Sequence, residues 1–341
     1  MTDHRSERDE SGAGDADAAG DPATDGSVAT AGDPATDGGA ATVDDATDAH
    51  LDAALAADGE SSVETATAGR STLRQTFRGT VEVAAREYRV AVRRRWAVGV
   101  AVLFALFSTA LVFLGGSGVG PARVDAVIAS FAQVGVYVVP LAALAAGYDT
   151  IVGADESGSL EMLLALPLSD TAVVVGKFVG RAVAVVGGML LGFAVGGALL
   201  VRYAGVGVLG SYAWVVLSAA GAALAFLGVG VLASALASEK TRALGGALAA
   251  WVWAVLVHDL VVLGAVASFG LPQWVVSAAV LANPADVFRV LVLQSVPTTA
   301  GGIAGVLAGT GLTAVTLGGA LAAWVFATVG GAVLAFRRRA V

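Results

Sequence analysis

Few side chains in this chain of 341 residues could do chemistry, and two of them stand together inside an apolar stretch. His258 and Asp259 come about 15 residues into that stretch, or about 23 Å along a helix. A histidine and a carboxylate at membrane depth are candidates for a functional site, whereas the same pair at the membrane surface is merely solvated. Because this position is near the far side of a bilayer, the sequence leaves both interpretations open.

Composition excludes much other chemistry. The chain has no cysteine and only three histidines and three methionines, so we expect no metal site and no disulfide in it. GGSG at 115–118 matches a serine motif of intramembrane proteases, but it falls in a loop, and His258 would be its only base. The segment 171–178 is no P-loop, because it lacks the first glycine and the hydroxyl residue after the lysine. We therefore expect neither catalytic residues nor bound nucleotide in this chain.

A short acidic segment at 153–170, GADESGSLEMLLALPLSD, separates two apolar runs. Gly158 breaks the chain, Ser159 can cap a helix, and Glu161 falls in its first turn, where a carboxylate favours the helix dipole. Pro167 ends the helix. Its apolar face is formed by Leu160, Leu163 and Leu164. The pattern predicts a short helix with an exposed apolar face, which either docks on a partner or lies on the lipid surface.

The elements that must position these residues are membrane spans. The chain is 56% hydrophobic, as is typical of integral membrane proteins. Six apolar stretches approach the roughly 20 residues that a bilayer requires, and they predict an all-α polytopic fold. The spans are expected at 97–114, 126–148, 182–201, 212–236, 243–263 and 311–335.

Basic residues between the spans predict the orientation. One side has Arg93–Arg95, Lys177, Arg181, Lys240, Arg242 and Arg337–Arg339. The other side has Arg123, Arg202 and Arg289. By the positive-inside rule, both termini are cytoplasmic, and the protein is expected in the cell membrane.

The region before the first span has two parts. Residues 1–64 contain 17 Asp and Glu against two Arg, which leaves 11 acidic and 18 basic residues in the remainder. The segment 1–68 has almost no large apolar residue and is predicted to be a disordered tail; its composition resembles that of haloarchaeal proteins. Apolar residues recur at helical spacing among the arginines of 69–96, which predicts a basic amphipathic helix on the cytoplasmic membrane surface. Nucleic-acid binding is the alternative, but a basic run beside a span is usually a topology anchor, so no nucleic acid is expected.

The third span and the turns before it carry an unbroken row of small residues at i+4 spacing. The row is Gly176, Gly180, Ala184, Gly188, Gly192 and Gly196. Such a row lets another helix approach closely. It predicts tight helix packing, and the functional alternative is that it lets helices slide past one another.

The connection at 264–310 is long, apolar and expected outside the cell. Asn283 fits a helix cap with Pro284 in the first helical position. Asp286 and Arg289, three residues apart, would give this helix one polar face. We predict that it lies along the outer membrane interface, where it either docks a partner or rests on the membrane.

The acidic segment and the residues after it resemble a family signature. The resemblance is carried by Glu156, Gly158, Ser159, Leu160, Glu161, Leu163, Leu164, Pro167, Ser169 and Gly176-Lys177. These residues are similar to the cytoplasmic signature of ABC-2-type permeases, the six-span subunits of ABC exporters. In that family the segment is a coupling helix, expected here at 156–166, that inserts into a groove of the ATPase. The resemblance implies an ATPase partner that binds ATP and Mg, a second permease copy in a homodimer, and no cofactor in this chain.

Shorter motifs resemble one subfamily, the permeases that serve maturation of the copper site of nitrous oxide reductase. They are REYRVAVRRRW before the first span, PLAALAAGYDTI at the end of the second, His258-Asp259, and ANPADVFR at 282–289. The resemblance implies export of a sulfur or copper-related species, with an extracytoplasmic maturation protein as a possible partner. Asp155 and Asp170 depart from the family pattern, in which basic residues are frequent there, so the identity of the ATPase stays open. The alternatives are a general exporter of lipids or hydrophobic small molecules, and a membrane scaffold without transport.

Overall fold

The computed structural model describes residues 76–93, 95–114, 121–166, 168–295 and 311–338. The regular elements within these ranges are all helical, as predicted. They belong to one compact unit, Glu64–Val341, and the fold below is that of this unit alone. The tail at 1–68 and Pro167 lie outside the described residues.

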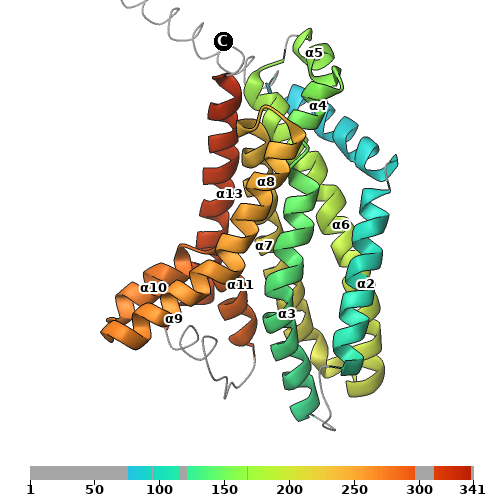
Figure 1. The fold of residues 1–341 in the computed structure, drawn as a ribbon. Helices are drawn as coiled ribbons and strands as arrows, with labels where there is room; N and C mark the ends of the chain where they lie inside the picture. Colours follow the sequence, from blue (N-terminus) through green and yellow to red (C-terminus); the bar gives the residue numbers. More distant parts are fainter. Residues whose placement is uncertain (1–75, 94, 115–120, 167, 296–310, 339–341) are drawn as a thin grey trace, which may run out of the picture. The chain divides into compact units, whose positions relative to one another are not determined.

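Six described helices are long and apolar enough to cross a membrane, which confirms the predicted number of spans (Figure 1). They are Trp96–Leu114, Val124–Glu156, Asp170–Ala204, Val206–Leu236, Lys240–Phe269 and Ala314–Arg337. Their labelled elements are α2 (Trp96–Leu114), α3 (Pro121–Gly147) with α4 (Val152–Glu156), α6 (Asp170–Ala204), α7 (Leu209–Leu236), α8 (Lys240–Val252) with α9 (His258–Phe269), and α13 (Ala314–Arg337).

Helix α7 lies among α3, α6, α13 and α11 (Pro284–Leu293). Small residues make these close contacts possible. A Cβ atom added to Gly147 of α3 would lie 3.0 Å from the Cα of Gly230 in α7, and the reverse holds as well. Because lipid is as apolar as leucine, such close van der Waals packing is what holds membrane helices together.

The small-residue row on α6 faces two neighbours within the same chain. Its first part packs against the helix at 76–93, and its second part packs against α2. An added Cβ at Gly180 would lie 2.5 Å from the carbonyl oxygen of Ala84, and one at Gly188 would lie 2.5 Å from that of Ala97. The tight packing that the spacing predicts is therefore present, and its partners are the two helices that precede the row.

The helix at 76–93 has two apolar sides. Val83 and Ala91 are buried on the side that faces the rest of the chain. The opposite stripe is exposed and consists of Phe77, Val81, Tyr88 and Val92. An amphipathic helix is thus present in this region, and its exposed apolar stripe suits a helix that lies on a membrane surface.

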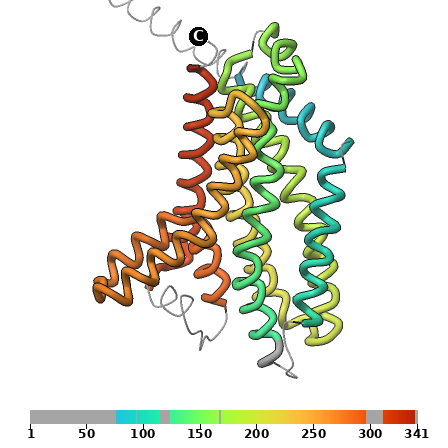
Figure 2. Tube along the Cα trace, in the orientation of Figure 1, coloured from blue at the N-terminus to red at the C-terminus, as the bar shows by residue number. Residues whose placement is uncertain are grey.

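The fifth span is interrupted. Helix α8 ends at Val252, the residues Trp253–Val257 form a π-helix, and α9 follows. Helices α9 and α10 (Gln273–Leu281) lie side by side and extend away from α2 and α6 (Figure 2). The chain then bends by 110° between α10 and α11, as in a broken span or a re-entrant loop.

The prediction that α11 lies along the outer membrane interface is wrong, because this helix is packed inside the bundle. All ten of its residues are buried, and it packs against α3, α7 and α13. Its start is as predicted, because Asn283 accepts a hydrogen bond from the N–H of Ala285 at 3.0 Å and Pro284 opens the helix. The predicted polar face of Asp286 and Arg289 turns inward, where its ionic partners His258 and Asp259 lie on α9.

Candidate functional site

The turn between α4 and α5 (Ser159–Leu164) presents the segment that resembles a coupling helix. Gly158 joins the two helices with a φ of 67°, a left-handed conformation that glycine adopts without steric cost. Gly158 also occupies the cap position that was predicted for Ser159, whose hydroxyl instead donates to the carbonyl of Ala154 at 3.2 Å. The helix predicted at 156–166 is therefore shorter than expected: Glu156 is the last residue of α4, and after the turn at Gly158 the helix α5 covers only Ser159–Leu164.

Only part of the predicted apolar face of α5 is exposed. Leu160 and Leu163 are 6% and 5% exposed, because this side of the short helix packs onto the rest of the chain. The expectation that these two leucines reach a partner is therefore corrected. The exposed large apolar residues are Met162 and Leu164 on α5 and Leu166 just after it, at 74%, 43% and 52%. We call these three residues the α5 tip; Glu156 and Glu161 are exposed beside it.

A single hydroxyl ties α4 to α7. The Oγ of Ser234 accepts hydrogen bonds from the backbone N–H groups of Ile151 and Val152, at 2.9 and 3.0 Å. N–H groups at the start of a helix have no partner within it, so an outside acceptor is needed. All three residues are buried, and a shift of α4 therefore moves α7 or breaks both bonds.

A buried ionic network joins α6 to the helix at 76–93 and to the turn between α3 and α4. Glu87 binds Lys177 through Oε2 at 3.1 Å and Arg181 through Oε1 at 2.9 Å. Arg181 also binds Asp149, with Nη1 2.6 Å from Oδ1. Burial raises the pKa of Glu87, but the two cations outweigh it and hold the pKa below its ordinary value of 4.5. Glu87 is therefore a carboxylate at neutral pH.

Lys240 extends this network toward α4. Its Nζ lies 3.7 Å from Oδ2 of Asp149, and its backbone N–H donates to Oε1 of Glu156 at 2.7 Å. The charged groups surround a cavity of about 490 Å³ that is lined by the helix at 76–93, α4, α6 and α8. The start of the fifth span is thus linked to the same network as α4, α6 and the helix at 76–93.

A second polar cluster lies where the fifth span breaks. The side-chain Nδ2 of Asn283 donates to the carbonyl of Ala254, inside the π-helix, at 2.7 Å. The same Asn283 caps α11 with its oxygen. Local π-helices recur at functional sites, and here the irregular turn is fixed to the start of α11.

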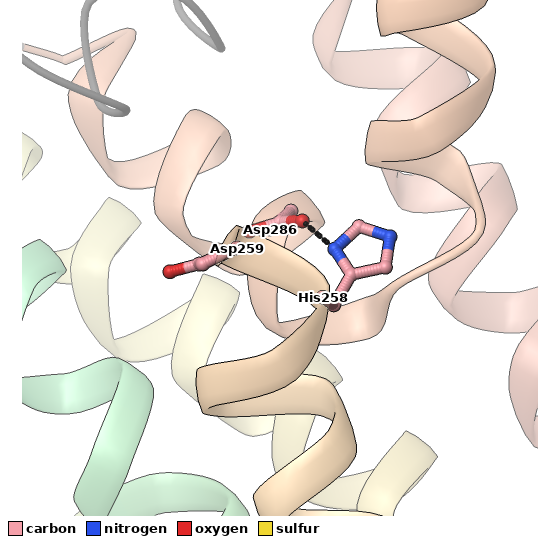
Figure 3. Close-up of side chains that lie close together, drawn as sticks. All are labelled: His258, Asp259 and Asp286. Atoms are coloured by element: carbon pink, nitrogen blue, oxygen red, sulfur yellow. Dashed lines mark ion pairs between the residues drawn. The ribbon is translucent and has the colours of Figure 1, made fainter. Parts of the chain in front are cut away.

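The ionisable side chains of α9 and α11 are paired with one another. His258 points at Asp286, with Nδ1 2.9 Å from Oδ2 (Figure 3). Arg289 bridges two carboxylates, because Nη2 lies 2.8 Å from Oδ2 of Asp259 and Nη1 lies 3.0 Å from Oδ1 of Asp286. The pair His258-Asp259 is therefore not simply solvated; it belongs to an ionic cluster that joins α9 to α11.

The cluster also has the composition of a metal site. His258, Asp259 and Asp286 offer donor atoms that lie within 4.8 Å of one another, and imidazole with carboxylate suits several transition metals. However, the buried guanidinium of Arg289 already binds both carboxylates. A metal ion would have to compete with this cation, so the residues fit an ionic clamp between two helices better than a metal centre.

Sequence reasoning missed most of the residues that join the helices around α4. Arg181 entered the prediction only as a topology signal, and Lys177 entered it as a topology signal and as part of the family signature. Glu87 entered it only as a member of the motif REYRVAVRRRW, and Ser234 did not enter it. A signal was present for Glu87, an acidic residue on a mainly basic helix, one turn after the buried Val83. No signal marks Ser234, because small polar residues are common in packed membrane helices.

Comparisons with known proteins agree with this architecture. A family model described as ABC-2 family transporter protein matches residues 81–340. The probable ABC transporter permease protein NosY of Pseudomonas aeruginosa is 32% identical over 269 residues, which are 76% of this chain and 98% of the relative. The protein of the same description from Stutzerimonas stutzeri is 34% identical over 273 residues, which are 75% of this chain and 97% of the relative. The chain therefore belongs to the ABC-2 transporter family, as a permease subunit of an ABC transporter that is similar to NosY.

Proposed function

We propose that this chain is the membrane subunit of an ATP-driven exporter and that a separate ATPase docks on the α5 tip. The observation that carries the proposal is the exposure of Met162 and Leu164 on the short helix α5, and of Leu166 just after it, outside the candidate spans. Leu160 and Leu163 of the same helix are buried against the rest of the chain, so the tip is held in place. An exposed apolar patch on a rigid element marks a surface that a partner covers. ATP and Mg would bind in the ATPase, and this chain would hold no cofactor.

The shape and charge of the tip indicate what the partner surface must offer. A short helix with protruding apolar side chains fits a hydrophobic groove. Exposed carboxylates at Asp155, Glu156 and Glu161 lie around the tip in sequence and would meet basic residues at the rim of that groove. The ATPase is therefore expected to present an apolar groove with a basic rim.

Movement of the docked helix would reach four other helices through contacts already described. Ser234 links α4 to α7, and Glu156 links α4 to the start of α8. From Asp149 the ionic network continues through Arg181 to Glu87, and hence to α6 and the helix at 76–93. Because packed interfaces move as rigid bodies, a push on α5 would tilt these helices together.

The similarity to NosY supports a substrate related to metal-site assembly outside the cell, a sulfur or copper-related species. The chain has no cysteine, and its three methionines give few soft ligands, so copper itself would be carried by partner proteins. An extracytoplasmic maturation protein would receive the exported species. The two copies of the permease would form a homodimer, with both termini in the cytoplasm.

One observation favours the alternative of an apolar cargo. A pocket of about 440 Å³ lies between α2, α3 and α8, and its lining includes Trp96, Leu103, Tyr137 and Trp251. Trp251 donates its indole N–H to the carbonyl of Tyr137 at 3.0 Å, which leaves the pocket walls apolar. Lipids or hydrophobic small molecules would suit this surface better than a charged ion does.

Affinity purification of the tagged chain from its own membranes in mild detergent tests the proposal. Wild type is expected to retain an ABC ATPase, and Met162→Asp is expected to lose it, because the new charge would be buried without a partner. The control Met162→Leu keeps an apolar side chain and should retain the ATPase. If wild type retained no ATPase, the remaining function would be that of a membrane scaffold that does not transport. Retention by Met162→Asp would place the docking surface elsewhere.

A further inference from the structure

An open groove of about 670 Å³ runs between α6 and α7, within two of the candidate spans. Its volume is in the range of about 300–1,000 Å³ that ligand pockets occupy. The side chains that line it are aliphatic, aromatic or small. A surface of this kind suits a hydrocarbon chain.

The floor of the groove is closely packed. Phe193 and Tyr212 form it, and the hydroxyl of Tyr212 donates to the carbonyl of Phe193 at 2.7 Å, so this polar atom is satisfied. Gly197 makes room for the tyrosine ring, since an added Cβ would lie 2.9 Å from it. Leu190 and Leu217 line the groove and are exposed. The floor is therefore fixed, while exposed side chains border it.

A positive charge stands at one end of the groove. Leu190, Ala194 and Ala198 line it along one i+4 row of α6, and Arg202 is the next residue of that row. From Val186 to Arg202 the helix rises about 24 Å, a large part of the roughly 30 Å of a bilayer core. Arg202 is exposed, and no ion pair found among the described residues includes it.

We propose that this groove binds a resident membrane lipid with an anionic headgroup. The acyl chain would lie along the row from Val186 to Ala198, over the aromatic floor. The guanidinium of Arg202 would bind the headgroup phosphate, to which it can donate two parallel hydrogen bonds. The lipid would bridge α6 and α7 at the end of α6 that is remote from α5. The site is independent of the proposed docking of an ATPase.

The test uses the full chain in nanodiscs that contain phosphatidylcholine and phosphatidylglycerol in equal amounts. The protein is extracted again, and native mass spectrometry identifies the lipid that stays bound. Ala198→Phe fills the groove from an exposed position, so it should fold and lose the retained lipid. Val195→Phe adds a ring at an exposed position outside the lining and should retain it. Arg202→Gln should reduce the preference for phosphatidylglycerol about fivefold, as expected for loss of one basic group beside anionic lipid, and Arg202→Lys should keep it.

Three results would overturn the proposal. In the first, Ala198→Phe retains as much lipid as wild type. In the second, wild type retains the two lipids equally, which would remove the role of Arg202. In the third, Ala198→Phe changes the oligomeric state while lipid retention stays the same, which would make the groove a contact between two copies of the chain.

Discussion

Two adjacent glycines in α6 offer a sharp test of the small-residue row, because only one of them faces α2. An alanine Cβ at Gly188 would lie 2.5 Å from the carbonyl oxygen of Ala97, whereas ordinary contact begins at 3.4 Å. At Gly187 an added Cβ meets nothing within 4 Å. Replacing glycine by alanine within a helix raises the free energy of unfolding by about 1 kcal/mol, and overpacking lowers it by about 1–3 kcal/mol. The obstacle is backbone and cannot rotate away, so the upper end of that cost applies.

We therefore expect Gly187→Ala to stabilise the protein by about 1 kcal/mol and Gly188→Ala to destabilise it by about 2 kcal/mol. Thermal unfolding of the two variants in the same detergent measures the difference, with melting temperatures that move in opposite directions from wild type. If Gly188→Ala melted at or above Gly187→Ala, the close approach of α2 to α6 would be wrong. Normal stability with reduced transport in Gly188→Ala would instead support sliding of the two helices.

Three further substitutions test the polar contacts. Ser234→Ala removes the acceptor of two buried N–H groups, so it should lower the free energy of unfolding by about 1–3 kcal/mol per group and reduce ATPase coupling. The control Ser218→Ala loses only a hydrogen bond within its own helix and should be nearly neutral. Arg289→Met removes the cation that binds the buried carboxylate of Asp286 and the partly exposed carboxylate of Asp259, and should destabilise by about 3–5 kcal/mol; unchanged unfolding would refute the clamp. Glu87→Gln should cost a similar amount, and adding Lys177→Met should recover part of it, which a double-mutant cycle measures.

The sequence alone predicts the parts of the fold that depend on composition and period. All six spans were recognisable, because each needs a long apolar stretch and little else. The i+4 row on α6 predicts close packing, since the spacing itself places Gly180 and Gly188 on one face. The start of α11 was predictable from Asn283 and Pro284, because a helix cap is a local feature.

Tertiary contacts account for what could not be predicted. Whether Leu160 or Met162 is exposed depends on which side of a short helix packs on the bundle, and two turns of helix do not determine that. The inward turn of Arg289 depends on Asp259, which is 30 residues earlier in the sequence. Glu87 and Lys177 are 90 residues apart, and no spacing rule connects them.

Site-specific cross-linking to the ATPase tests the central claim most directly. The chain has no cysteine, so Met162→Cys introduces a single thiol at the α5 tip, and Phe326→Cys introduces one at an exposed position on α13 as a control. With the ATPase co-expressed, a short thiol-to-amine cross-linker should join it to the Met162→Cys chain and leave the Phe326→Cys chain unlinked. No cross-link at Met162→Cys, or an equal yield from both variants, would contradict docking of the ATPase on the α5 tip.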